Sequence, residues 1–188
     1  MGDTPKGRIL RAASHLFVTG GYGSTSVREL AAAVGIQSGS LFHHFVTKHD
    51  ILESVMVEVI ELNTERMRDA MVDSATPLER LRALIICELN SIHGETSEAM
   101  SLLTREWRSL DPEARARVLV LRDRYEQLWL DTLAASADQL VAIAPPMLRK
   151  LIMGMLTQSA YWFDRDGAMD LDGLADTIMS LLMRKESD

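Results

Sequence analysis

Apolar residues recur along most of the chain at the three- and four-residue spacing of an amphipathic helix. The first segment shows this spacing at Ile9, Ala12, Ala13, Leu16 and Phe17. This pattern predicts a helix over about residues 4–19, ended by the glycine-rich segment 20–23. No stretch alternates convincingly with the two-residue period of a strand, so the pattern predicts an all-α protein of about nine helices.

Capping residues, prolines and glycines divide the remaining pattern into helices. Ser26 followed by Glu29 fits a capping box, and Gly35 stands where a helix end needs a left-handed residue. Thr47 and Asp50 form another start signal, while Pro77 suits a first helical position. The predicted helices after the first span about residues 26–34, 38–44, 48–72, 77–93, 97–109, 112–137, 145–163 and 171–183.

Charge is distributed unevenly between the two ends of the chain. The whole chain carries a formal net charge of −7. Residues 1–48 hold five basic and two acidic side chains, a net of +3, so the rest carries −10. This asymmetry indicates a small head that faces nucleic acid on an acidic body. We therefore expect a nucleic-acid-facing head over residues 1–48 and a separate acidic body over residues 49–188.

Targeting and redox signals are few. No charge-free apolar run approaches the roughly 20 residues that a bilayer crossing needs, and the N-terminal basic residues are not followed by an apolar block. The single Cys87 excludes an internal disulfide. We expect a cytoplasmic protein with no membrane partner.

The two short helices on either side of Gly35 predict a helix-turn-helix, whose second helix can lie in the major groove. That helix offers polar side chains for reading bases: Gln37, Ser38, Ser40, His43 and His44. Gln can bond adenine bidentately, and serine can serve several bases. Gly39 would let the backbone approach the groove closely. Double-stranded DNA is therefore the expected partner.

Other residues are expected to hold the DNA backbone. Lys48 begins the next helix and could meet a phosphate together with its amide N–H groups. On the opposite flank the candidates are Thr25, Ser26 and Arg28. Leu41, Phe42 and Phe45 are interpreted mainly as core, although Phe42 could also stack against sugar-phosphate.

Enzymatic and metal chemistry find little support in the sequence. His43, His44 and His49 lie close together, but adjacent histidines point to different sides of a helix, and no Cys or acid cluster completes a set. We expect no metal site and no cofactor. No nucleophile stands with a histidine and an orienting acid, so no catalytic residue is predicted. The alternative to a DNA-binding protein is a helical interaction protein without specific DNA binding.

Four stretches near the N-terminus together resemble the TetR family of repressors: residues 21–31, Val34-Gly35-Ile36, residues 39–45, and Lys48 with Leu52. The resemblance covers about 45 continuous residues. Phe42, His44 and Phe45 take the places of the aromatic residue and the His/Tyr-Phe pair in the family pattern. Gln37 departs from it, because the family often has serine after the turn.

The resemblance implies a DNA-binding domain over residues 1–48 and an effector-binding and dimerisation domain over residues 49–188. It further implies a dimer on a palindromic operator, with an effector pocket in the fourth to seventh helices and a dimer interface made by the eighth and ninth. Candidate pocket residues are Leu89, Leu103, Arg105, Glu106, Arg122, Tyr125 and Trp129. Arg105 and Glu106 could instead form a buried pair. Candidate interface residues are Leu151, Met155, Ser159, Trp162, Leu174 and Ile178.

A second, looser resemblance concerns the effector. The segments 105–113 and 161–167 are similar to a TetR subgroup that controls the breakdown of lipids, fatty acids or steroids. Some regulators of that subgroup sense acyl-CoA thioesters. The chain is therefore expected to be a one-component repressor that a small apolar or acyl-CoA-type effector releases from DNA.

Overall fold

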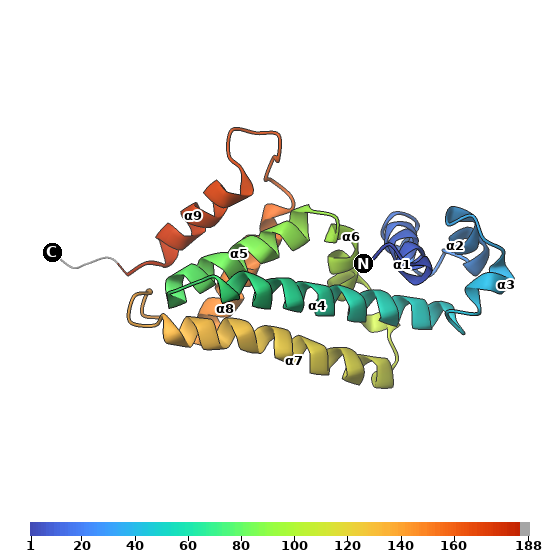
Figure 1. Ribbon diagram of the computed structural model, residues 1–188, viewed down its shortest axis with the longest axis horizontal. Coiled ribbons are helices and arrows are strands. Elements are labelled where there is room, and N and C mark those ends of the chain that lie inside the picture. Colours follow the sequence, from blue (N-terminus) through green and yellow to red (C-terminus); the bar gives the residue numbers. More distant parts are fainter. Residues whose placement is uncertain (185–188) are drawn as a thin grey trace. The chain divides into compact units, whose positions relative to one another are not determined.

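The computed structural model describes residues 1–184, and residues 185–188 of the expected second domain lie outside that range. Within it the chain forms nine α-helices, a π-helical turn and a 3-10 turn (Figure 1). The described part holds one isolated β-bridge, between Leu140 and Met183, and no strand. The predicted all-α fold is confirmed. The helices are α1 (Pro5–Leu16), α2 (Val27–Ala33), α3 (Ser38–Leu41), α4 (Lys48–Val72), α5 (Pro77–His93), α6 (Ser97–Arg105), α7 (Pro112–Ala135), α8 (Pro145–Ser159) and α9 (Leu171–Leu182).

Capping explains where several helices begin. Ser26 and Glu29 exchange hydrogen bonds at the start of α2, at 3.2 Å from the Glu29 amide and 2.6 Å from the Ser26 amide. Thr76 and Glu79 do the same at the start of α5. Such pairs satisfy backbone N–H groups that have no partner inside the helix. The predicted starts of both helices are confirmed.

Some helices end earlier than predicted. The amides of His44 and Phe45 both donate to the Leu41 carbonyl at 3.0 Å, so α3 closes in a tight turn and ends at Leu41. The end of α8 similarly passes into i→i+3 bonds after Ser159. A π-helical turn, Phe17–Gly21, continues α1. Single-sequence periodicity does not reveal these changes of hydrogen-bond register.

The described chain divides into two compact units. The first comprises Met1–Leu62 with Glu95–Arg122, and the second comprises Asn63–Gly94 with the chain from Asp123 onward. The boundaries fall inside α4 and α7, so each of these long helices contributes to both units. The expected head, residues 1–48, lies wholly in the first unit together with the beginning of α4, α6 and the beginning of α7.

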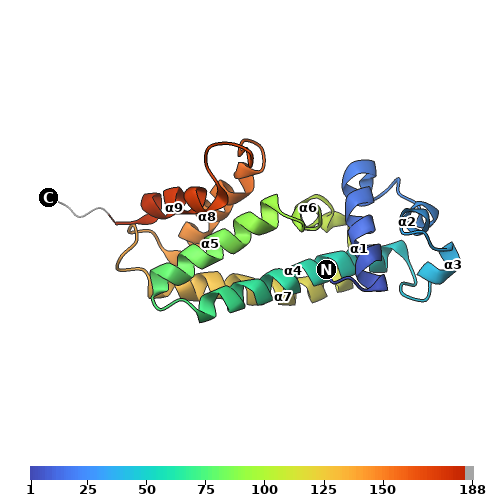
Figure 2. The same cartoon turned by 45° about the horizontal axis from the view of Figure 1, so that its top comes forward.

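The second unit is built around α5. Both α8 and α9 pack against it (Figure 2). Arg82 of α5 bonds Asp176 at 2.6 Å and Asp172 at 3.1 Å, which fixes α9 on α5 from the surface. The core between these helices is aliphatic and includes Leu84, Ile85, Leu89, Ile152, Leu156, Leu174 and Ile178.

None of the helices in residues 1–184 combines the length and apolar character needed to cross a membrane.

We predict that Gly35→Ala destabilises the protein by about 1–2 kcal/mol, because an L-residue pays that penalty in the left-handed region. Gly35 has φ +71°, as the sequence predicted. Urea unfolding checks the value. Gly39→Ala is the matched control: its φ is not positive, and an added Cβ there meets no atom within 4 Å. Equal losses in the two variants would contradict the role given to Gly35.

Candidate nucleic-acid interface

The helix-turn-helix is formed by α2, the turn over residues 34–37, and α3. The Gly35 amide donates to Ala32 and the Ile36 amide donates to Ala31, both near 3 Å, so the chain reverses within a few residues. Leu30 and Leu41 are fully buried beneath the two helices. These contacts hold α3 at a fixed angle to α2, which a recognition helix requires.

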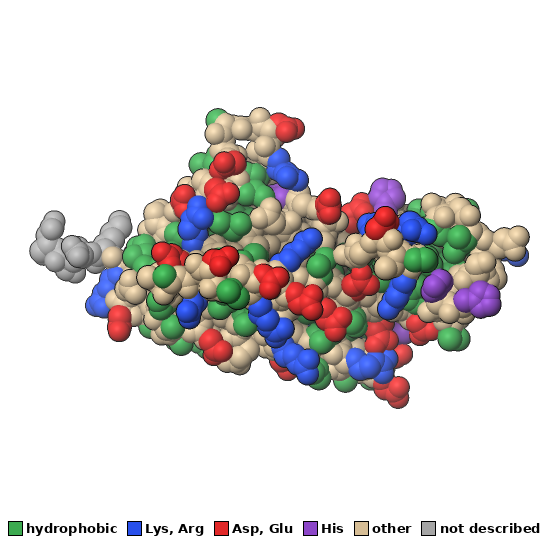
Figure 3. Space-filling view, viewed as in Figure 1, with side chains coloured by type: hydrophobic (Ala, Val, Ile, Leu, Met, Phe, Trp, Pro, Cys, Tyr) green, Lys and Arg blue, Asp and Glu red, His purple; other side chains and the backbone are tan. Residues whose placement is uncertain are grey.

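The outer face of α3 and the residues after it is polar and open to solvent. Gln37, Gly39, Ser40, His43 and His44 are exposed, and Ser38 is partly exposed. Figure 3 shows histidine side chains on the surface near α3. The candidate base-reading side chains therefore share one accessible region of the first unit.

The two phenylalanines of this segment differ in burial. Phe45 is buried, as predicted, but Phe42 is 52% exposed. The interpretation of Phe42 as mainly core is wrong, because the tight turn after Leu41 brings Phe45 inward and leaves Phe42 outside. Phe42 thus lies among the candidate DNA contacts. Val46, which the sequence analysis missed, is also strongly exposed.

The opposite flank offers fewer contacts than the sequence suggested. Arg28 is exposed on α2. Ser26 is exposed too, but its hydroxyl already caps α2. Thr25 is buried, and its hydroxyl faces the carbonyls of Gly21 at 2.9 Å and Leu16 at 3.2 Å. Thr25 therefore stabilises the end of the π-helical turn and does not present its hydroxyl to a phosphate.

Lys48 has a role that the sequence analysis did not foresee. Its ammonium group donates to the carbonyls of Tyr22 at 2.7 Å, Thr25 at 2.9 Å and Gly23 at 3.2 Å. It also lies 4.5 Å from the centroid of the Tyr22 ring, which adds a cation–π contact. All three ammonium hydrogens are engaged, so in this structure Lys48 ties the start of α4 to the segment before α2 instead of projecting toward a phosphate.

Further polar contacts hold the helices of the first unit together. His15 of α1 lies 2.8 Å from Glu98 of α6, and His49 of α4 lies 3.1 Å from Asp111, which caps α7. The pKa of Asp111 is lowered, chiefly because its carboxylate accepts the Ala114 amide at 2.7 Å and to a lesser extent because of His49. His49 thus pairs with a capping acid. Residues 1–184 contain no group of three or more His, Cys, Asp or Glu side chains that could hold a metal ion.

The expected effector residues fall in both units. In the first unit, Arg105 is exposed at the end of α6, Glu106 accepts a hydrogen bond from Ser109, and Arg122 stacks 5.5 Å from the Trp107 centroid. Leu103 is half-buried on α6. The interpretation of Arg105 and Glu106 as a buried pair is wrong, because Arg105 faces solvent.

The second unit brings its expected effector residues together with others. Leu89, Tyr125 and Trp129 are buried. The Tyr125 hydroxyl donates to Glu88, and the Arg149 guanidinium lies 4.2 Å from the Trp129 centroid. Sequence reasoning missed Glu88 and Arg149. The lone acid inside the apolar run of residues 84–89 was the signal that could have found Glu88.

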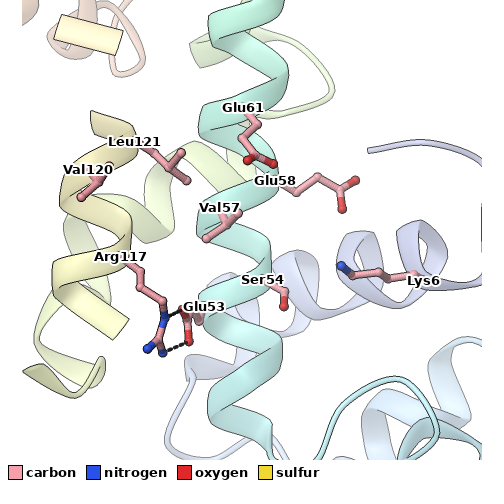
Figure 4. A pocket seen from close by; sticks show the side chains of 9 residues that line it. All are labelled: Lys6, Glu53, Ser54, Val57, Glu58, Glu61, Arg117, Val120 and Leu121. Carbon is pink, nitrogen blue, oxygen red and sulfur yellow. Dashed lines mark hydrogen bonds and ion pairs between the residues drawn. The ribbon is translucent and has the colours of Figure 1, made fainter. Parts of the chain in front are cut away.

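A hollow of about 540 Å³ lies in the first unit between α1, α4 and α7 (Figure 4). Glu53 and Arg117 form a bidentate ion pair at its wall, at 2.6 and 2.9 Å. None of the expected effector residues lines it. Its lining consists of Lys6, Glu53, Ser54, Val57, Glu58, Glu61, Arg117, Val120 and Leu121.

The expected interface residues divide by burial. Ser159, Leu174 and Ile178 are buried within the chain, and Ser159 lies 2.7 Å from His93. They form part of the core of the second unit and offer no surface to another subunit. Leu151 and Trp162 are exposed and Met155 is half-buried. Exposed apolar side chains that the sequence analysis did not select include Met147, Tyr161 and Leu181.

A fold of this kind, with a short recognition helix in the first unit and a helical body, is the architecture of a helix-turn-helix DNA-binding regulator. The family model for bacterial regulatory proteins of the tetR family matches residues 9–55. The model for the tetracyclin repressor-like C-terminal domain matches residues 74–185. The chain belongs to the TetR family of transcriptional regulators, a class of non-enzymatic DNA-binding proteins.

Individual relatives agree with this assignment. The transcriptional repressor KstR2 of Mycobacterium tuberculosis is 29% identical over 138 residues, which cover 73% of this chain and 68% of the relative. The structure of AibR in complex with isovaleryl coenzyme A and operator DNA is 25% identical, with a TM-score of 0.82, over 94% of this chain and 97% of that one. The structure of PfiT, described as a superantigen, is 43% identical, with a TM-score of 0.83, over 98% of each chain.

We predict that Lys48→Ala lowers the free energy of unfolding by about 1–3 kcal/mol, because hydrogen bonds to a charged group are lost and three carbonyls lose their donor. Urea unfolding measures the change. Lys6→Ala removes the same charge from an exposed position in the same unit and should change the unfolding free energy by less than about 0.5 kcal/mol. If both variants unfold like the wild type, Lys48 does not have the structural role inferred from its contacts.

Proposed function

We propose that this chain is a one-component repressor that binds a palindromic operator as a homodimer and is released by a small effector. The observation that carries the DNA-binding part is the exposed polar face of α3, positioned by buried Leu41 and Phe45 behind it. Gln37 and Ser40 are the side chains proposed to read bases, with Ser38, His43 and His44 beside them. The protein would act in the cytoplasm, where the bacterial chromosome lies.

Sequence readout and phosphate contact are assigned to different residues. Gln37, at the start of α3, has the amide that suits bidentate bonding to adenine. Arg28, exposed on α2, is proposed to contact a phosphate. Gly39, which has no side chain, is proposed to let the protein backbone approach the DNA closely. Phe42 is proposed to pack on a sugar or a thymine methyl. Lys48 stabilises the segment that precedes α2 by donating hydrogen bonds to its carbonyls.

The dimer is proposed to form through exposed apolar side chains of α8 and the segments around α9. Leu151, Met155 and Trp162 from the expected set remain candidates, and Met147 and Leu181 join them. A twofold-symmetric pair would present two α3 helices roughly 34–36 Å apart, one turn of DNA. The operator would therefore be a palindrome.

The effector is proposed to be an apolar molecule or an acyl-CoA thioester. AibR, a structural relative at 25% identity, is described in complex with isovaleryl coenzyme A. A relative in Bacillus subtilis, 25% identical over 182 residues, is described as a fatty acid metabolism regulator. The effector can change DNA affinity only by preferring one conformation of the protein, and α4, which contributes to both units, is the proposed route.

Two other functions remain as outcomes of the tests. A helical interaction protein would bind no DNA site specifically. The superantigen description belongs to PfiT, and no contact in residues 1–184 singles out that activity here. The exposed residues of α3 are the observation that favours DNA binding.

We predict that Gln37→Ala and Arg28→Ala weaken operator binding in different ways. The operator is first selected from fragments of the source genome. Loss of the Gln37 amide should cost about 1–3 kcal/mol and relax preference at one base pair in each half-site. Loss of Arg28 should weaken all sequences alike and, because a dimer loses two phosphate contacts, reduce the salt slope by about 2. Fluorescence anisotropy with single-base variants of the operator separates the two effects; identical base preference in Gln37→Ala and wild type would rule out readout by Gln37.

We predict that Leu151→Glu yields monomers, because a buried unpaired carboxylate at an apolar interface is unfavourable. Sedimentation velocity measures the state, and operator affinity should fall with dimerisation. Leu119→Glu is the matched control, because Leu119 is 44% exposed on α7 in the first unit while Leu151 is 48% exposed. A Leu151→Glu protein that remains dimeric would place the interface elsewhere.

A further inference from the structure

The surface around α3 contains no lysine or arginine. Residues 29–47 run from the first turn of α2 to the residue before α4, and neither basic residue type occurs among them. Proteins that bind DNA draw much of their affinity from cations that contact phosphates. A surface proposed to lie in the major groove therefore has to obtain positive charge from another kind of side chain.

Most lysine and arginine side chains of residues 1–48 have other positions or partners. Lys6 lines the hollow between α1, α4 and α7. Arg8 and Arg11 of α1 lie 3.8 and 3.4 Å from the carboxylate of Asp3. The ammonium group of Lys48 donates to three backbone carbonyls. The net charge of +3 on this segment is thus not concentrated at α3.

Two histidines are the titratable side chains of residues 36–47. His43 and His44 follow α3 directly, and both are exposed. Within residues 1–184 their side chains have no hydrogen-bond or ion-pair partner, and His44 makes one ring contact, with Phe45. Histidine is the side chain whose charge ordinarily changes between about pH 5 and 8. Each of the two can therefore add one positive charge to this surface.

The charged groups of the neighbouring elements leave the two histidines without an anion from the protein. Arg28 is exposed on α2, which packs against α3. The other charged or titratable groups beside the segment have contacts of their own: Glu29 in the capping box, Lys48 with the carbonyls of residues 22–25, His49 with Asp111, and Asp50 with the Thr47 amide. DNA phosphates would therefore be the anions that a protonated histidine meets here.

We propose that operator binding is linked to protonation, with His43 and His44 contacting DNA phosphates as imidazolium cations that take up protons when the complex forms. This proposal rests on the DNA-binding function proposed above and names the chemistry by which the α3 surface gains positive charge. A nearby phosphate favours the charged form of an imidazole. The complex then holds more protons than the free protein and DNA, so a lower pH strengthens binding.

The test measures operator affinity by fluorescence anisotropy at pH 8 and pH 6, at constant ionic strength. The wild type should bind about tenfold more tightly at pH 6, because a dimer presents two copies of each histidine. Its salt slope should also be steeper at pH 6, since each protonated histidine adds a phosphate contact. In the double variant His43→Gln/His44→Gln the side chains stay polar and cannot be charged. It should bind like the wild type at pH 8 and gain less than about twofold at pH 6.

His15→Gln is the matched control, because His15 is an exposed histidine of the same unit that lies on α1 and pairs with Glu98. It should keep the full pH response of the wild type. The single variants His43→Gln and His44→Gln should each keep part of that response, and circular dichroism at both pH values checks that every variant is folded.

Two outcomes would overturn this proposal and leave DNA recognition by α3 intact. One is an equal pH response in the double variant and the wild type. The other is specific operator binding by the wild type with the same affinity and salt slope at both pH values. If the wild type binds no DNA sequence specifically at either pH, the proposed function itself fails, and the linkage to protonation fails with it.

Discussion

The position of the recognition helix depends on one ammonium group. Lys48 binds three carbonyls of residues 22–25, where the π-helical turn after α1 leads into α2. Without this donor, those carbonyls would have to accept hydrogen bonds from water at a half-buried site. Since α2 begins at Val27 and α4 begins at Lys48 itself, this contact closes the segment that contains the whole helix-turn-helix. The turn at Gly35 then sets the angle of α3 within it.

Histidine–acid pairs extend this arrangement within the first unit. His15 joins α1 to α6, and His49 joins α4 to the cap of α7. The bidentate pair of Arg117 and Glu53 adds a second link between α4 and α7. Exposed ion pairs are individually weak. Each of these pairs nevertheless connects α1 or α4 directly to α6, α7 or the residue that caps α7 within the first unit.

The sequence predicted the fold well because helix starts are local. The Ser26 and Thr76 caps and the left-handed Gly35 each depend on residues within one helical turn. The binding residues were harder. Gln37, Ser40 and Arg28 are exposed as expected, but Thr25 and Lys48 turned inward, because carbonyls brought near by the tertiary fold compete for their donors. Periodicity also could not distinguish buried Leu174 from exposed Leu181 on α9. It could not show that Glu88 and Arg149 lie together, because their contact depends on how α5, α7 and α8 pack.

The surface around α3 is proposed to recognise a particular DNA sequence. The most direct measurement is the ratio of the affinities for the selected operator and for a shuffled duplex of the same length, at physiological salt. Specific recognition predicts a ratio of about 10³ or more. A ratio near one would contradict sequence-specific recognition, because binding would then rest on phosphate charge alone.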